Sequence, residues 1–211
     1  MTSTNYLSPA DFKKMIDAVP LVTEYNIGKL LGYSKEKVPK PEYIQGALWV
    51  QYCHALRISE VLNLTYGDFN FDRNILSLHN TKTGKGKKQF TSIPPDLPRW
   101  VKDYILFVNT SEKNVIEKKL FPFNRQLMWS YVKKACKMAG LDLYEQQDTR
   151  EIIGAWTHLI RKSRAKLMIE LGAAEVMVKV KLRHTFTTTE RYTKPDINAL
   201  IKWELGNIHG I

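Results

Sequence analysis

The most informative stretch of this sequence runs Leu182-Arg183-His184-Thr185-Phe186-Thr187-Thr188-Thr189-Glu190-Arg191-Tyr192. Thr187 and Glu190 have the spacing of a capping box, which predicts that Tyr192 lies in the first turn or two of a short helix ended by Pro195. A phenol is a poor nucleophile at its free pKa of about 10. A site that used Tyr192 as a nucleophile would therefore surround it with cations and proton donors.

Two earlier segments carry groups of this kind. In Leu56-Arg57-Ile58-Ser59-Glu60, the Arg57 guanidinium could fork onto a phosphate while the Glu60 carboxylate, three residues on, holds it. His158 and Arg161 are three apart in a predicted helix, so both project from one face. Each pattern also has a plainer interpretation, because an isolated R-x-x-E is usually a surface ion pair and a basic helix face is usually solvated.

A third segment, residues 81–88, places lysines at the tip of a predicted hairpin. Lys82 lies at the end of its strand, and a flexible ammonium there suits a general acid that reaches its target only after binding. The plainer interpretation of Lys85, Lys87 and Lys88 is a solvated turn.

Taken in order, these groups resemble the catalytic residues of the tyrosine recombinase family, the phage-integrase and Xer-like enzymes. The six matching positions are Arg57, Lys82, His158, Arg161, His184 and Tyr192. The first is followed, as in the family, by a leucine-rich stretch that ends in Asp68-Phe69. Each match alone is weak to moderate, but their joint order is specific.

Two departures from the family pattern concern the segment before the tyrosine. Arg183 stands where the family usually has glycine, and His184 and Tyr192 are eight positions apart, one fewer than the commonest spacing. Both departures bear more on the role of His184 than on that of Tyr192.

The resemblance implies an enzyme that cuts and rejoins double-stranded DNA through a 3′-phosphotyrosine intermediate on Tyr192. Arg57 and Arg161 would stabilise charge on the phosphate, Lys82 would protonate the leaving oxygen, and His158 would donate to a phosphate oxygen or shuttle a proton. No metal, ATP or other cofactor is expected, since guanidiniums can supply the electrostatic stabilisation that Mg²⁺ supplies elsewhere. Glu60 would support the site. The expected DNA contacts are Lys85, Lys87, Lys88, Lys162 and Arg164.

Two alternatives remain open from the sequence. A type IB topoisomerase uses the same tyrosine chemistry to relax DNA without exchanging partners. A regulator could keep the fold and bind DNA without cutting it, although every expected catalytic position is filled here.

The periodicity predicts a mainly α fold with a small antiparallel β-sheet (α+β), that of a tyrosine recombinase catalytic domain spanning 1–211. Helices are expected to begin at Pro9, Pro41 and about Ser59, and to cover 100–108, 125–139, 157–171, 173–181 and 197–205. Strands are expected at 74–80 and 87–93, with a short third at 68–72. Residues 141–155 carry no assignable pattern. The helical core-binding domain that most family members carry is not expected here, so the chain is either a catalytic fragment or a minimal enzyme.

The amino-acid composition of the chain indicates which kinds of partner it binds. The 32 Lys and Arg against 21 Asp and Glu give a net charge of +11, which favours a polyanion such as nucleic acid. No apolar run is long enough to span a membrane, no signal peptide is visible, and Cys53 and Cys136 show no metal or redox spacing. We expect a cytoplasmic, nucleoid-associated protein of prokaryotic or viral origin, with no membrane partner. The apolar residues of 196–211 could close the domain's own core or contact a neighbouring protomer in a DNA-bound tetramer, with a monomer when free.

Overall fold

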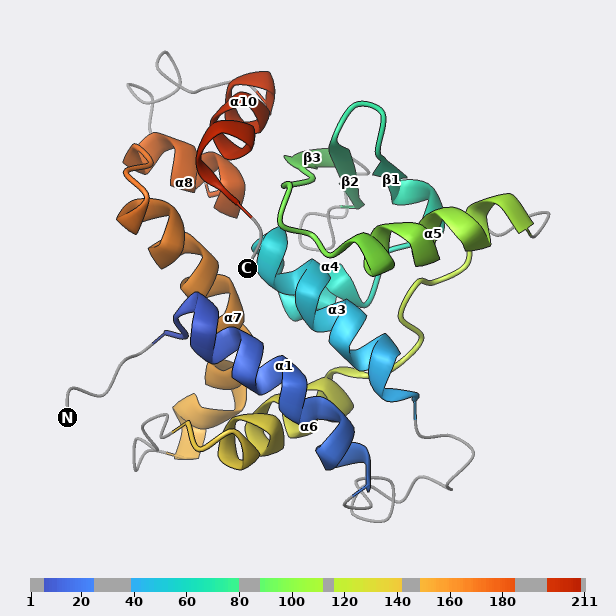
Figure 1. The fold of residues 1–211 in the computed structure, drawn as a ribbon, viewed down its shortest axis with the longest axis vertical. Coiled ribbons are helices and arrows are strands. Elements are labelled where there is room, and N and C mark those ends of the chain that lie inside the picture. The colour runs from blue at the N-terminus through green and yellow to red at the C-terminus, as the bar shows by residue number, and fades with distance from the viewer. Residues whose placement is uncertain are drawn as a thin grey trace.

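The computed structural model describes residues 6–24, 39–79, 88–111, 116–141, 149–184 and 197–209. It is a mainly helical α+β fold with one three-stranded antiparallel sheet, which confirms the predicted class (Figure 1). In chain order the elements are α1 (Pro9–Glu24), α3 (Pro41–Cys53), α4 (Ile58–Val61), η2 (Tyr66–Asp68), β1 (Phe69–Asn70), β2 (Ile75–His79), β3 (Lys88–Ser92), α5 (Arg99–Ser111), α6 (Arg125–Met138), α7 (Thr149–Glu170), α8 (Glu175–Leu182) and α10 (Ile197–Asn207).

The main core is built where α1, α3, α6 and α7 pack together. Ser8 Oγ accepts a hydrogen bond from the Asp11 backbone N–H at 3.1 Å and so caps α1, which begins at Pro9 as predicted. Phe12 is fully buried and stacks on Tyr52 of α3 with ring centroids 4.0 Å apart. Trp49 meets the same phenyl ring edge-on at 5.0 Å. Aromatic packing thus fixes α1 against α3.

The sheet has the strand order β1-β2-β3, with both pairs antiparallel. Ile75 pairs with Ser92 and His79 with Lys88, which confirms the predicted pairing of two strands around a turn. The third strand is shorter than expected, because only Phe69 and Asn70 pair with β2. The turn itself, residues 80–87, lies outside the described residues.

The helices α6 and α7 end near glycines, whereas α7 begins at a different residue from the one that the sequence pattern predicts. Gly140 and Gly172 adopt φ of +67° and +79° just beyond α6 and α7, as expected for glycines that stop helices. However, α7 begins at Thr149 rather than Thr157. Gly154 and the polar residues before it interrupt the helical pattern, which explains why the sequence alone placed the start too late.

A second, smaller core lies between the end of α7, α8 and α10. Met168, Val178, Val180 and Leu200 are buried in it. The helix α10 packs against α8 and β3 of its own chain (Figure 1), so it closes its own domain. None of the described helices has the length and apolar character that crossing a membrane requires.

Candidate active site

The centre of the site is the carboxylate of Glu60, on the first turn of α4. Arg57 precedes this helix in an extended conformation, with φ −72° and ψ 149°. Its backbone N–H donates to Glu60 Oε2 at 2.6 Å and its Nη1 donates to Glu60 Oε1 at 2.8 Å. The Arg57 side chain is 30% exposed, against 10% for that of Glu60. The carboxylate therefore fixes an arginine that stays accessible from outside.

Arg161 reaches the same carboxylate from α7. Its Nη1 lies 3.8 Å from Glu60 Oε2, and its side chain is 6% exposed. Nη1 donates to the Ala55 carbonyl at 2.6 Å, and Nη2 donates to the Leu182 carbonyl. The fold thus gathers the two arginines predicted from the sequence around one acidic group.

A third guanidinium, that of Arg183, completes the cluster. Arg183 Nη2 donates to Glu60 Oε2 at 2.7 Å, and its side chain is 4% exposed. Its backbone ends α8 in the left-handed conformation, with φ 54° and ψ 40°. Because only glycine adopts this conformation freely, the geometry explains why glycine is usual here. No role for Arg183 was predicted from the sequence, although its departure from the family pattern was the signal.

The three guanidiniums control the ionisation of the site. Burial raises the pKa of Glu60, but Arg183, the Arg57 backbone N–H and the guanidiniums of Arg57 and Arg161 outweigh it, so the pKa is lowered. Burial, together with Arg183 and Arg57, lowers the pKa of Arg161 to about 10. Arg161 therefore stays charged at neutral pH. Three guanidiniums against a single carboxylate leave this cluster positive and suited to an anion.

Both predicted histidines lie beside this cluster. His158 is on α7, and His184 follows α8. Burial lowers the pKa of each, and Arg161 and Arg57 lower both further. The two rings are therefore mostly neutral at pH 7, so each can donate one hydrogen bond and accept another.

The remaining predicted residues divide between exposed, buried and undescribed positions. Lys88 at the start of β3 and Lys162 on α7 are exposed. Tyr192, Lys82, Lys85 and Lys87 lie outside the described residues. Across the described ranges, no group of three or more His, Cys, Asp or Glu side chains is placed to hold a metal ion.

The prediction that Arg164 contacts DNA is wrong, because this side chain is fully buried. Arg164 Nη2 donates to Asp96 Oδ1 at 3.2 Å, and Nη1 bonds the other oxygen of the same carboxylate. Arg164 follows Arg161 by three residues, so it projects from the inward face of α7. Lys162 lies on the outward face. The sequence predicts a surface position for Arg164 because its acidic partner, Asp96, is distant in the sequence.

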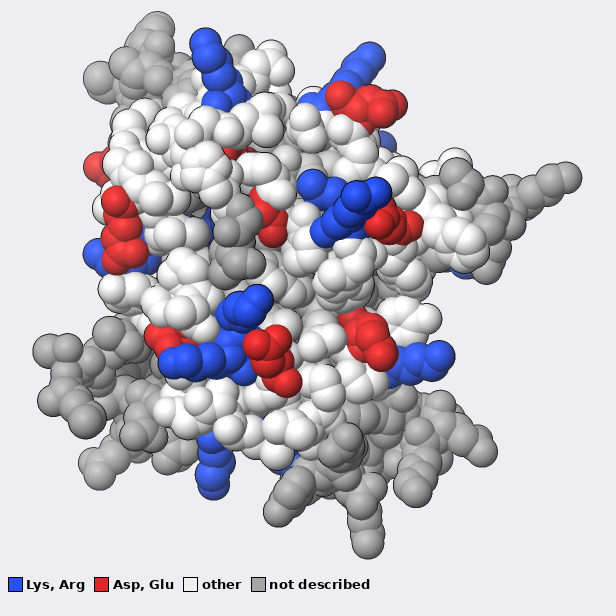
Figure 2. All heavy atoms as spheres, viewed as in Figure 1, with Lys and Arg blue, Asp and Glu red and all other residues white. Residues whose placement is uncertain are grey.

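Figure 2 shows the face of the molecule over α1, α3 and α5. Lys and Arg side chains are interspersed there with Asp and Glu. The surplus of positive charge is therefore not gathered into a single basic patch on the described part of this face.

The sequence of this chain is similar to those of several known proteins. A model of the phage integrase family matches residues 21–198. The tyrosine recombinase XerD of Neisseria meningitidis serogroup B is 28% identical over 166 residues, which cover 75% of this chain and 54% of the relative. The tyrosine recombinase XerA of Pyrococcus furiosus is 29% identical over 185 residues, covering 82% of this chain and 56% of the relative. The chain thus spans about half the length of the curated relatives it matches.

Solved structures show the same fold. The integrase of mycobacterium phage Brujita superposes with a TM-score of 0.59 at 10% identity, covering all of this chain and 61% of the integrase. The XerH site-specific recombinase, bound to its difH substrate in a pre-cleavage complex, gives a TM-score of 0.56 at 14% identity, covering 95% of this chain and 53% of XerH. The family match extends over most of the sequence and includes the segments that carry Arg57, Glu60, Arg161 and Arg183. The chain belongs to the phage integrase family.

Proposed function

We propose that this chain is the catalytic domain of a site-specific DNA recombinase that cleaves and rejoins duplex DNA through a 3′-phosphotyrosine intermediate. The observation that carries the proposal is the convergence of Arg57 and Arg161 on Glu60. Family membership supports it, as do the names of the relatives, which are tyrosine recombinases.

In the proposed step, the oxygen of Tyr192 attacks a DNA phosphorus and the bond from that phosphorus to the 5′ oxygen breaks. The phenol proton leaves to a neutral histidine, for which His158 and His184 are the candidates, and Lys82 gives a proton to the 5′ oxygen. The tyrosine keeps the phosphate as a diester, so a 5′ hydroxyl can attack it and reverse the step. The step written in this way requires neither ATP nor a metal ion.

The arginine cluster supports this chemistry electrostatically. Negative charge grows on the non-bridging oxygens as the phosphorus gains its fifth oxygen. Arg57, which is partly exposed and held by Glu60, would donate to those oxygens without rearranging. Arg161 lies behind it on the same carboxylate and adds positive charge at short range.

The first experiment is a covalent-adduct assay in EDTA. It uses duplexes with randomised sites, each nicked so that the cleaved end diffuses away and the enzyme stays attached. We expect an SDS-resistant adduct with the parent protein and none with Tyr192→Phe, which lacks the nucleophilic oxygen. Sequencing the captured DNA would identify the target site.

The outcome that contradicts the proposal is DNA binding without an adduct at any site in the pool. An adduct that persists in Tyr192→Phe would place the nucleophile elsewhere. An adduct that appears only when Mg²⁺ is added would refute the metal-free step.

We also propose that the protein assembles as a homo-oligomer, a tetramer on two sites, when bound to DNA. The helix α10 offers Leu205 for a contact between protomers, because this side chain is 53% exposed while Leu200 of the same helix is buried. Leu205→Glu is expected to leave the monomer folded and to reduce the DNA-bound assembly in sedimentation velocity. Ile169→Glu on α7, equally exposed at 54%, is the matched control. Equal assembly of both variants and the parent would contradict a role for α10.

A further inference from the structure

Arg183 carries two unfavourable features that need a reason. A left-handed backbone strains a residue other than glycine, and Arg183 has φ 54°. Its guanidinium is also almost fully withdrawn from water, which disfavours the charged form. Burial accordingly lowers the pKa of Arg183, although Glu60 opposes this.

Three hydrogen bonds of the Arg183 guanidinium go to the segment that carries Arg57. Besides the 2.7 Å bond to Glu60, its Nη2 donates to the Ala55 carbonyl at 3.3 Å and its Nη1 to the His54 carbonyl at 3.4 Å. A further bond from Nη1, 2.9 Å long, returns to the carbonyl of Lys181 at the end of α8. The side chain thus joins the end of α8 to the start of α4.

We propose that Arg183 is a positioning residue of the recombinase site, which holds the Glu60 carboxylate between the two phosphate-binding arginines. This inference rests on the proposed function. Arg183 Nη2 donates a hydrogen bond to Glu60 Oε2 at 2.7 Å, while Arg161 Nη1 lies 3.8 Å from the same oxygen. Without Arg183, Oε2 keeps the bond from the Arg57 backbone N–H, and Arg161 can take the place of Arg183 as its second partner. The carboxylate would then neutralise the charge that the site needs for the phosphate.

Arg183 and Arg161 also share an acceptor. The Ala55 carbonyl receives Arg161 Nη1 at 2.6 Å and Arg183 Nη2 at 3.3 Å. In return, Arg161 Nη2 bonds the carbonyl of Leu182, the residue before Arg183. The two guanidiniums therefore share the Ala55 carbonyl, and Arg161 also holds the backbone beside Arg183, so a change at Arg183 reaches Arg161 by two routes.

A further consequence concerns His184, the next residue along the chain. The charged groups that face its ring are Arg161 from α7, Arg57 from the start of α4, Arg183, and Lys179 from α8. After burial, these cations lower the pKa of His184, so removal of Arg183 is expected to raise it. This response is independent of DNA cleavage and separates an electrostatic role from simple support of the backbone.

The test compares Arg183→Gly and Arg183→Lys with the parent. Glycine accepts a φ of 54° without strain, so any loss comes from the missing guanidinium and not from the backbone. We expect the single-turnover rate of adduct formation to fall about 10-fold or more in Arg183→Gly, as for loss of a hydrogen bond to a charged group. DNA affinity should stay within about threefold, because Arg183 is buried and does not face a phosphate. Arg183→Lys keeps the charge but not the forked geometry, so it should recover only part of the rate.

The matched control is Asn74→Gly, which also places glycine at a positive φ, of 51°, but in the turn before β2. Its adduct rate should equal that of the parent. The second readout is an NMR titration of His184 in the free proteins, with the pKa higher in Arg183→Gly than in the parent and unchanged in Asn74→Gly.

Two results would overturn the proposal: an unchanged adduct rate in Arg183→Gly, or a reduced rate with an unmoved His184 titration, which would indicate structural support alone. If the parent itself forms no adduct, the proposed function fails. In that case the His184 titration still reports whether Arg183 acts on the cluster, so the two failures can be told apart.

Discussion

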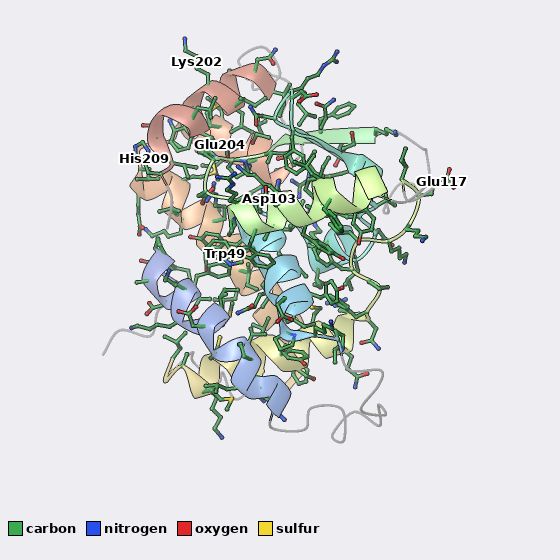
Figure 3. The ribbon with its side chains drawn as sticks, turned by 45° about the vertical axis from the view of Figure 1, so that its right-hand side comes forward. Trp49, Asp103, Glu117, Lys202, Glu204 and His209 are labelled. Atoms are coloured by element: carbon green, nitrogen blue, oxygen red, sulfur yellow. The ribbon has the colours of Figure 1, made fainter. Side chains whose placement is uncertain are left out.

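Lys181 of α8 and Glu204 of α10 form a buried ion pair, with Nζ 2.7 Å from Oε1 and side chains 0% and 1% exposed. Lys181 Nζ also donates to Ser92 Oγ at 2.9 Å, and Ser92 donates to the second oxygen of Glu204. Figure 3 shows Glu204 lying toward the interior of the molecule, whereas Lys202 of the same helix extends outward. The Glu204 carboxylate therefore connects α10 to α8 through an ion pair and to β3 through a hydrogen bond.

The pair belongs to a larger neutral cluster. Arg164 Nη2 lies 3.7 Å from Glu204 Oε1, and the same guanidinium bonds Asp96. Two cations and two carboxylates balance, and α10 supplies one of the carboxylates. Removing α10 would leave buried positive charge without a partner, which disfavours its release.

The first prediction concerns this contact. Glu204→Gln should lower the free energy of unfolding by about 3–5 kcal/mol, as expected when one partner of a buried pair is lost. Urea denaturation followed by circular dichroism measures the change. Glu175→Gln is the control, because its pair with Lys179 is 3.0 Å long but Glu175 is 83% exposed. That loss should stay below about 1 kcal/mol, and equal losses in both variants would show that burial does not determine the contribution.

A second prediction separates two neighbouring basic residues of α7. Lys162→Met should weaken DNA binding and reduce the slope of log affinity against log salt by about one, the signature of a lost phosphate contact. Arg164→Met should leave this slope unchanged but destabilise the fold by about 3–5 kcal/mol, because Asp96 loses its buried partner. Fluorescence anisotropy over a salt series and urea denaturation check the two effects. A reduced slope in Arg164→Met together with an unchanged slope in Lys162→Met would place Arg164 on the DNA-binding surface.

The third prediction follows from the lowered pKa of Glu60. A carboxylate whose folded pKa lies below its usual 4.5 contributes stability above pH 4.5, and this contribution is lost as pH falls through the folded pKa. Glu60→Gln cannot titrate. The difference in unfolding free energy between parent and Glu60→Gln should therefore shrink as pH is lowered from about 6 to about 3. A difference that stays constant across this range would mean that the arginines do not stabilise the ionised carboxylate.

A fourth prediction tests the forked geometry of Arg57. Arg57→Lys keeps the charge but cannot donate two parallel hydrogen bonds, so adduct formation should fall about 100-fold while DNA affinity changes little. Arg99→Lys, in an ion pair that is 93% exposed on the arginine side, is the control and should match the parent. A parallel fall in affinity and rate for Arg57→Lys would indicate a simple phosphate contact instead.

Local features of the fold were predictable because short-range physics controls them. Ser8 begins α1, the apolar spacing of Phe12 and Met15 gives its buried face, and Gly140 ends α6. The start of α7 was missed because Gly154 interrupts the helical pattern of the sequence.

The site was predictable only in part. The residue types and their order pointed to Arg57, Glu60 and Arg161, and the fold brings all three together. The burial and the contacts of Arg183 could not be predicted from the sequence, because its carboxylate partner, Glu60, lies 123 positions away.

By itself, the sequence determined the order of helices and strands and which side chains have the chemistry of a phosphate site, since both depend on residue type and near neighbours. Only the tertiary structure decided which charges face solvent and which are buried. Lys162 and Arg164 are both basic residues of one helix, yet one is exposed and the other fully enclosed. A buried charge is tolerated only where the fold supplies an opposite one. For Arg164 that partner comes from Asp96, 68 positions earlier.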